Sequence, residues 1–505
     1  MSKYTCVILP VLILLCMKIT QPLLPGLHLS SLRKKPRSFA QKCLDEKIRK
    51  RSKSIAGLKA CFGRFIPEKF LTNNTEKKHS RHRVFSKENT FWAFFSQIID
   101  ADGGCAEVVR KMQTYLAIHG EYSLSASTGA YCKSRANLKE DDLVEIFNHT
   151  ASSFEVHPGD QPLAGRRVVV VDGTGLSMPD TPENQVVWPQ ISSQKEGCGF
   201  PSMRLLGCFD LATGAVLSYA IENKKRHELP LLRQQDETFK KGDIFLGDKG
   251  FCSFFDLNRF HEMGVDSVVT LARRIPKTER TCVNKNDKND LLIHWERPAW
   301  YKKAPLPKDE WNQLPKVLLL RQIKVEVKQP GFRTKSFYII TTLLDPANYS
   351  AQEIAELYYR RWSVELFFRD QKTTLKMEIL RCKSPDMIRK ELLMHLIAYN
   401  AIRHLIYEAA RRHEKDPMRI SFKGALQALR QAEFSFHKEA YSPKIISQLK
   451  ASLHHAIAEK TVPFRPERSE PRCIKRRPKP FQLLTQPRHE MVETKHRGKY
   501  DAKAA

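Results

Sequence analysis

Arg167-Val168-Val169-Val170-Val171-Asp172-Gly173-Thr174 is the stretch that decides the fold of this chain. Its run of valines predicts a strand over Val168–Asp172 that is buried on both faces, as in a sheet covered by helices on both sides. An Asp at the end of such a strand lies at the rim of the sheet, where solvent and substrate can reach it. Asp-Gly is also common in turns, so a turn role for Asp172 stays open.

A second segment repeats this pattern. Ile244-Phe245-Leu246-Gly247-Asp248 is followed by Lys249-Gly250, which again predicts a short apolar strand, an Asp and a Gly turn. Two rivals for this second acidic position remain. Asp210 closes another predicted strand, whereas Asp243 precedes its strand and would lie at the opposite rim.

The order of the predicted elements indicates an α/β fold. A meander of three strands precedes an alternation of helices and strands, which is the order of the RNase H-like fold with its mixed sheet flanked by helices. That fold brings the ends of its first and fourth strands side by side. The predicted strands are Val168–Asp172, Met203–Asp210, Ala215–Ile221, Ile244–Asp248 and Asp266–Leu271, with helices over His227–Phe239 and Ser253–Met263.

A third acidic residue lies in a predicted helix. The stretch YYRRWSVELFFRDQK, which begins at Tyr358, has apolar residues at helical spacing and no Gly or Pro from Ala351 to Lys376. At about 100° per residue, Arg361, Glu365 and Lys372 fall within about 60° of Tyr358 on one face. One carboxylate with two cations and a phenol suits a surface that binds metal and phosphate. A solvated, salt-bridged helix face is the alternative.

Carboxylates from two strand ends and a helix can together bind divalent cations. Oxygen ligands of this hardness suit Mg²⁺ or Mn²⁺. Two such ions can activate water or a 3′-hydroxyl and stabilise the leaving oxygen in an attack on a phosphodiester.

The spacing Tyr358-x2-Arg361-x3-Glu365-x6-Lys372 resembles the Tyr-Arg-Glu-Lys signature of bacterial insertion-sequence transposases of the IS-four family, which are DDE enzymes. The segments VVVVDGTG and LGDKGF resemble the two Asp motifs of that family, and the resemblance covers roughly residues 125–488.

The resemblance implies a role for each matched residue. Asp172, Asp248 and Glu365 would form the catalytic metal triad, and Tyr358, Arg361 and Lys372 would contact the phosphates of the transposon end. It also implies a cut-and-paste DNA transposase that hydrolyses phosphodiesters at the element's ends and transfers the 3′-hydroxyls to target DNA. Two alternatives stay open: an RNase H-fold nuclease without strand transfer, and a catalytically silent DNA-binding descendant.

A β-rich insertion is expected over residues 274–350, because Ile323, Val325 and Val327 alternate with charged residues before a Gln-Pro-Gly turn. Relatives in the family carry such an insertion, and a Trp within it stacks on a base that is flipped out when the transposon end folds into a hairpin. Trp295 or Trp300 could do so here. A Trp that covers the insertion's own core is the alternative.

The remaining segments complete the expected organisation. Residues 1–29 form an apolar extension, 30–163 a basic arm and a helical DNA-end-binding domain, 164–273 and 351–462 the two parts of the catalytic core, and 463–505 a basic, Pro-rich flexible tail. The apolar run Cys6–Met17 is too short to span a bilayer.

Composition agrees with a polyanionic partner. Lys plus Arg outnumber Asp plus Glu by 85 to 55 over 505 residues, a net charge of +30, which favours a polyanionic partner with nucleic acid as the natural candidate. The resemblance implies that this partner is double-stranded DNA. The 12 cysteines include no CxxC pair, so no structural zinc is expected. We expect a cytoplasmic protein, associated with the nucleoid through DNA, that makes no use of a membrane and forms a dimer in its synaptic complex.

Overall fold

The computed structural model describes residues 56–72, 84–118, 124–224, 227–271, 280–326, 336–437, 442–463, 484–493 and 500–502. The quoted stretch forms the centre of the fold. Strand β1 (Val168–Ser177) begins as predicted but continues five residues past Asp172. Its four valines are fully buried, and their side chains alternate between two hydrophobic clusters, one on each face of the sheet. Burial on both faces explains the unbroken run of β-branched residues.

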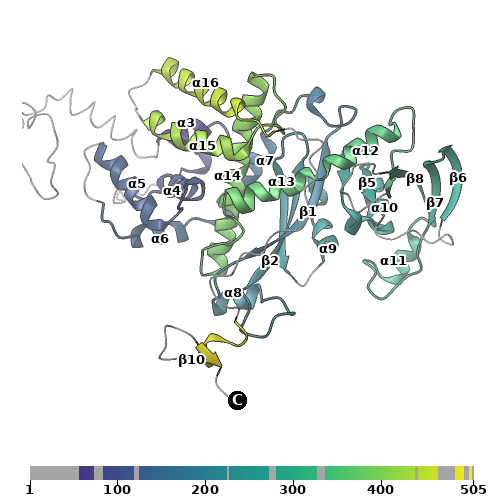
Figure 1. Ribbon diagram of the computed structural model, residues 1–505, viewed down its shortest axis with the longest axis horizontal. Helices are drawn as coiled ribbons and strands as arrows, with labels where there is room; N and C mark the ends of the chain where they lie inside the picture. The colour runs from purple at the N-terminus through teal and green to yellow at the C-terminus, as the bar shows by residue number, and fades with distance from the viewer. Residues whose placement is uncertain are drawn as a thin grey trace, which may run out of the picture. The chain divides into compact units, whose positions relative to one another are not determined.

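The strands form one mixed sheet of nine in the order β3-β2-β1-β4-β5-β9-β8-β7-β6 (Figure 1). The pairs β1–β2 and β2–β3 are antiparallel, and the pairs β1–β4 and β4–β5 are parallel. The predicted adjacency of the first and fourth strands is therefore confirmed. The remaining strands of this half are β2 (Ser202–Asp210), β3 (Val216–Asn223), β4 (Ile244–Leu246) and β5 (Asp266–Thr270).

Helices cover both faces of the sheet, as the valine run requires (Figure 1). One cluster packs Val168 and Val170 with the helices that follow β9, and the other packs Val169 and Val171 with helices that lie between β3 and β5. The first face carries α12 (Ala351–Arg360), α13 (Ser363–Arg369) and the long α14 (Pro385–Arg412), with α15 (Phe422–Ala432) and α16 (Pro443–Glu459) behind. The second face carries α9 (Glu228–Leu232) and α10 (Phe254–Glu262).

The residues of the expected insertion extend this sheet. Strand β9 (Ser336–Thr341) pairs antiparallel with β5 and with β8 (Val317–Glu326), so the β-rich segment continues the core sheet beyond β5. The predicted period-two strands are therefore confirmed, although the turn between them lies outside the described residues. The outer elements are β6 (Arg280–Asp287), β7 (Asp290–Glu296) and α11 (Lys308–Gln313).

Helices precede the sheet in the chain, as expected. Helix α4 (Lys87–Ile99) is buried along almost its whole length and packs against α14, as does α7 (Glu140–Ser152). The helical N-terminal part therefore shares a core with the helices that follow the sheet. The other elements are α3 (Ala56–Phe62), α5 (Cys105–Ile118), α6 (Gly129–Ala136) and α8 (Pro182–Val187). A short hairpin of β10 (Met491–Glu493) and β11 (Tyr500–Ala502) lies near the C-terminus.

Several expectations fall on residues that the structure does not describe. The apolar run Cys6–Met17, the basic arm up to residue 55 and most of the expected tail lie outside the described residues. Within the described ranges, no helix combines the length and the apolar character needed to cross a membrane.

Candidate active site

The parallel register of β1 and β4 places two aspartates at the same rim. Val170 pairs with Leu246, so Asp172 and Asp248 each lie two residues beyond the same paired position. Neighbouring strands are about 4.8 Å apart, and equal offsets give side chains the same face. That face is the one on which α13 and α14 pack. Asp172 lies within β1, opposite Gly207, and it reaches solvent because β4 ends sooner than β1.

The structure separates the rival aspartates from this rim. Asp210 pairs with Val169, toward the opposite end of β1, and is buried. It accepts a 2.7 Å hydrogen bond from the Thr213 hydroxyl within the turn that leads to β3. Asp243 is also buried and forms an ion pair with Arg167. Both carboxylates therefore stabilise the local backbone on the side away from Asp172.

The helix predicted through Tyr358–Lys372 is not continuous in the structure. Helix α12 ends at Arg360, the chain turns at Arg361 and Trp362, α13 follows, and a π-helical turn over Asp370–Thr374 ends the segment. The amides of Arg361 and Trp362 donate to carbonyl groups three residues back, which tightens the backbone at this junction. No Gly or Pro causes this break, and both side chains that flank it are held by contacts with the sheet.

Those contacts involve Tyr358 and Arg361. The Tyr358 side chain is 7% exposed, and its hydroxyl lies 3.0 Å from the Thr270 hydroxyl at the end of β5. Burial raises the pKa of Tyr358. Arg361 is 6% exposed, and its Nη1 lies 3.9 Å from Oδ2 of Asp172. In this structure the two residues are packed within the site, so their predicted phosphate contacts remain predictions.

Lys372 reaches the same rim from the π-helical turn. Its Nζ donates to the Thr174 hydroxyl at 3.2 Å, and Thr174 lies two residues after Asp172 on the same face of β1. Glu365 lies in the first turn of α13, which packs against β1. The Glu365 side chain is exposed and has no hydrogen bond or ion pair among the described residues. Its carboxylate is therefore available to a ligand.

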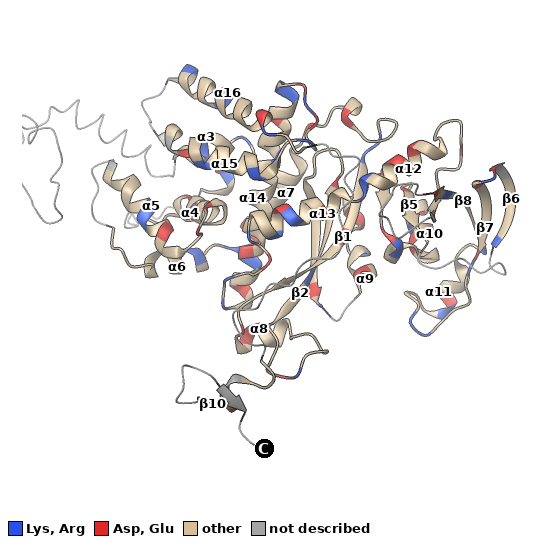
Figure 2. Cartoon of the chain, in the orientation of Figure 1, with Lys and Arg blue, Asp and Glu red and all other residues tan. Residues whose placement is uncertain are grey.

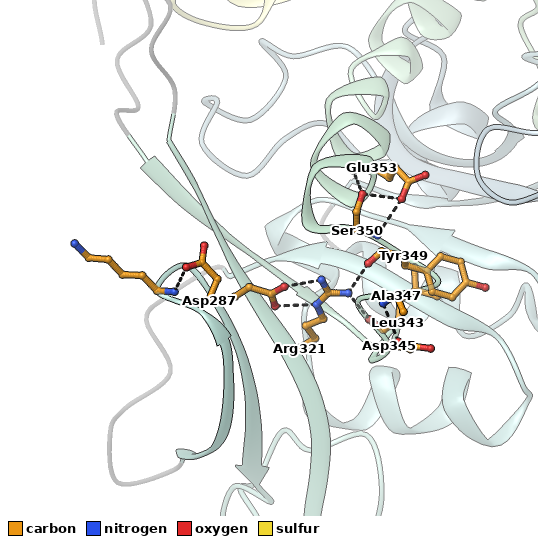
Figure 3. A network of polar contacts seen from close by, with 10 residues as sticks. Asp287, Arg321, Leu343, Asp345, Ala347, Tyr349, Ser350 and Glu353 are labelled. Carbon is orange, nitrogen blue, oxygen red and sulfur yellow. Dashed lines mark hydrogen bonds and ion pairs between the residues drawn. The ribbon is translucent and has the colours of Figure 1, made fainter.

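The start of α12 is fixed by a network of polar contacts that runs from buried Arg321 to the surface, as Figure 3 shows. The fully buried Arg321 of β8 donates from Nε and Nη2 to both oxygens of Asp290, at 2.8 and 2.6 Å. Its Nη1 donates to the Tyr349 carbonyl at 2.6 Å. Ser350 and Glu353 then form a capping box at the first turn of α12. The outer strands thus position the helix that leads to Arg361.

The two candidate tryptophans differ in exposure. Trp295 is 8% exposed and packs edge-on against Phe254 of α10, so in this structure it is a core residue. Trp300 is 38% exposed, and its Nε1 donates to the Leu306 carbonyl. The prediction of base stacking therefore stays with Trp300. Trp362 was not predicted; it is 50% exposed beside the site, and the Arg361 guanidinium lies 4.6 Å from its ring centroid.

Negative charge gathers around Asp172. Burial raises the pKa of Asp172 to about 6, the Gly173 amide opposes this by donating to Oδ1 at 2.8 Å, and the charges of Asp248 and Glu228 raise the pKa further. The nearby charge of Arg361 lowers it. Glu228 at the start of α9 was not predicted, because a single Glu after a strand carries no sequence signal.

This environment fits a divalent cation, which would stabilise the ionised form of Asp172. Among the described residues, no three His, Cys, Asp or Glu side chains lie close enough together to hold a metal ion. Asp172 and Asp248 thus lie at the same rim of the sheet, and Glu365 lies on the neighbouring helix. The three carboxylates do not form a complete metal site in this structure.

Comparison with known proteins identifies similar sequences. A model for the family described as "Transposase DDE domain" matches residues 163–401, which include Asp172, Asp248 and Glu365. Transposase InsG for insertion sequence element IS4 of Escherichia coli (strain K12) is 24% identical over 404 residues, 79% of this chain and 87% of that protein. The Escherichia coli transposase for insertion sequence element IS421 is 33% identical over 60 residues, 12% of this chain and 16% of that protein. A cryo-EM structure of the piggyBac transposase synaptic complex with hairpin DNA has a TM-score of 0.40 at 11% identity, covering 83% of this chain and 88% of that one.

Proposed function

We propose a residue-level mechanism on the premise that this chain is a DDE transposase of the IS4 (IS-four) family. It is a DNA-cleaving and strand-transferring enzyme, and the family depends on divalent metal. In our proposal Asp172, Asp248 and Glu365 hold Mg²⁺ or Mn²⁺, with two ions at the centre. The observation that supports this assignment is the parallel register of β1 and β4, because Asp172 and Asp248 each lie two residues beyond its last pair, Val170 with Leu246.

The strand order supports an RNase H-like core for this mechanism. Strands β3-β2-β1 form the antiparallel meander, and β4 and β5 add in parallel on the other side of β1. The segment from β6 to β9 would then be an insertion that extends the sheet, while the helices before β1 would bind the element's end.

The bound ions would supply Lewis-acid activation of water or a 3′-hydroxyl and would stabilise the leaving oxygen. The chain's own residues would position the reactants. Arg361 would limit the repulsion between Asp172 and Asp248, and Lys372 would hold a phosphate of the scissile strand close to Thr174. Glu365, which contacts no other polar group within the described part of the chain, would complete the set of metal ligands when DNA and metal bind. The exposed rings of Trp300 and Trp362 would stack on bases near the cleavage site.

Positive charge would hold the DNA around this centre. Lys and Arg are distributed over the helices and the sheet, as Figure 2 shows, and the whole chain carries a net charge of +30. A charge of this size supports contact with a long stretch of double-stranded DNA, including the transposon ends and the target. We propose that a dimer pairs two ends in the synaptic complex, and that the protein acts in the cytoplasm, where it meets bacterial DNA.

A strand-transfer assay tests this function against its alternatives. Purified protein would be incubated with pre-cut transposon ends that carry free 3′-hydroxyls and with a target plasmid, in Mg²⁺ or Mn²⁺. Joining of the ends to the plasmid is the expected result. Cleavage of uncut ends without joining would favour the nuclease, and end binding without either reaction would favour the silent descendant.

A further inference from the structure

Gly173 has no side chain, and the space that its Cβ would need is filled by Glu228. This space lies next to Asp172. A Cβ atom added at Gly173 would lie 2.3 Å from Oε1 and 2.6 Å from Cδ of Glu228. Real atoms do not approach so closely, so the Glu228 carboxylate occupies the space that any side chain at position 173 would need. This carboxylate therefore lies against the backbone of the residue that follows Asp172.

Other elements fix Glu228 at this place. Nη1 of Arg204 on β2 donates to Oε1 of Glu228 at 3.1 Å, and both side chains are partly exposed. Glu228 begins α9, which packs against β2, β3 and the 3-10 turn Lys249–Phe251 that directly follows Asp248. Glu228 is thus held from the opposite face of the sheet from Glu365, between the two segments that carry the aspartates.

The position of the Glu228 carboxylate leaves one of its oxygens available to a cation. Arg204 contacts only Oε1, and Oε2 of Glu228 has no hydrogen bond among the described residues. The carboxylate keeps an oxygen free next to the rim, while the ion pair with Arg204 fixes its direction. An oriented carboxylate whose charge acts on Asp172 and Asp248 also attracts a divalent cation or the waters that such a cation binds.

We propose that Glu228 is a fourth acidic residue of the reaction centre, which strengthens binding of the divalent cation from its position against Gly173. The inference rests on the proposed function, because it requires that Asp172 and Asp248 hold the metal. Glu228 is a positioning residue here, acting on the cation or its hydration shell from the second face of the sheet.

Binding of Mn²⁺ to the full-length protein without DNA tests this role independently of turnover. Free Mn²⁺ would be measured by electron paramagnetic resonance for wild type, Glu228→Gln and Glu183→Gln. Glu183 is an exposed acidic residue of α8 and serves as the control. Since loss of such supporting groups lowers metal affinity about 10-fold or more, we expect Glu228→Gln to weaken binding by about 10-fold and Glu183→Gln to leave it unchanged. Glutamine can still accept the hydrogen bond of Arg204, so wild-type affinity in Glu228→Gln would overturn the proposal.

Gly173→Ala provides a second test. The added methyl would displace the Glu228 carboxylate, so we expect Gly173→Ala to weaken Mn²⁺ binding to a similar extent as Glu228→Gln. In a Glu228→Ala background, where the space is vacant, the same change should have a smaller effect. Equal effects of Gly173→Ala in both backgrounds would contradict the proposed contact. Asp172→Asn separates failure of the role proposed for Glu228 from failure of the proposed function. If Asp172→Asn binds Mn²⁺ as wild type does, the proposed function itself fails.

Discussion

Nη1 of Arg361 lies 3.9 Å from Oδ2 of Asp172, and this pair joins the junction between α12 and α13 to the central strand of the sheet. Both side chains are largely buried, and the Arg361 guanidinium is also packed between Tyr358 and Trp362. Because the charge of Arg361 lowers the pKa of Asp172, the helical segment that carries Glu365 also favours ionisation of the first aspartate.

Removal of this cation should impair catalysis. We expect Arg361→Gln to lower the rate of transposon-end cleavage by about 100-fold, the usual cost of losing one preorganised charged group in an active site. The matched control is Arg369→Gln, because Arg369 is an exposed residue of the same helical segment. Cleavage of an end substrate in single-turnover conditions measures both variants. Equal rates for Arg361→Gln and Arg369→Gln would show that the contact with Asp172 has no catalytic role.

Substitutions of Trp295 in β7 and of Trp300, which follows β7, should have separate effects on stability and on DNA binding. Trp295→Ala removes a core side chain and should destabilise the protein by about 3–5 kcal/mol. Trp300→Ala should leave the melting temperature unchanged and weaken binding to a transposon end by about 1–3 kcal/mol, the range for loss of base stacking. Thermal unfolding and a fluorescence-anisotropy titration with the end duplex measure the two effects. Unchanged end affinity in Trp300→Ala would remove this residue from the DNA interface.

The buried pair of Arg321 and Asp290 should contribute to the position of α12. Arg321→Met takes the bidentate partner away from the buried carboxylate of Asp290, so we expect this change alone to cost about 3–5 kcal/mol of stability. The double change Arg321→Met with Asp290→Leu should recover most of that loss. Because Nη1 of Arg321 also holds the Tyr349 carbonyl, the double variant should still cleave ends more slowly than wild type. Wild-type cleavage by the double variant would mean that this network serves stability alone.

Two buried histidines predict sensitivity to acid. Burial lowers the pKa of His404 to about 4 and that of His395 to about 3, from 6.5. Since the unfolded chain binds protons that the folded chain excludes, stability is present above pH 6.5 and is lost as the pH falls from 6.5 toward these values. His404→Gln should reduce the loss between pH 6.5 and 5 by about 2 kcal/mol. Urea unfolding at both pH values checks this, and an unchanged loss in the variant would contradict the burial of a neutral His404.

Local pattern was enough to predict the catalytic half of the fold. The valine run and the segments VVVVDGTG and LGDKGF predicted the strands, because burial on both faces of a sheet selects continuous runs of apolar residues. The meander of three strands before the helices then predicted the adjacency of β1 with β4. Local pattern could not show that β9 pairs with β5, since the partner of a strand edge is decided by tertiary contacts. The break at Arg361 has the same origin: helical propensity favours continuation, and contacts of Tyr358 and Arg361 with the sheet override it.

The candidate site was also only partly accessible from sequence. Asp172 and Asp248 could be predicted as candidates because each comes directly after a run of apolar residues typical of a buried strand, and the parallel register of β1 and β4 brings these two positions of the chain to the same rim. Glu228, which we propose as a further acidic residue, has no sequence signal, because it reaches Gly173 from another layer of the fold and no spacing in the sequence relates the two residues. The difference in exposure between Trp295 and Trp300 arises because Trp295 lies in β7 and packs against Phe254 of α10, whereas Trp300 lies beyond the end of that strand. No local pattern encodes this tertiary contact.

Excision from a supercoiled plasmid that carries the element's ends tests the central claim most directly. Wild type, Asp172→Asn, Asp248→Asn and Glu365→Gln would be compared in Mg²⁺ and in Mn²⁺, with Asp180→Asn as a control, since Asp180 is an exposed acidic residue beyond the end of β1. We predict metal-dependent excision by wild type and Asp180→Asn, and loss of excision in the other three while binding to the ends persists. Excision that survives in Asp248→Asn or Glu365→Gln would contradict the assignment of these three carboxylates.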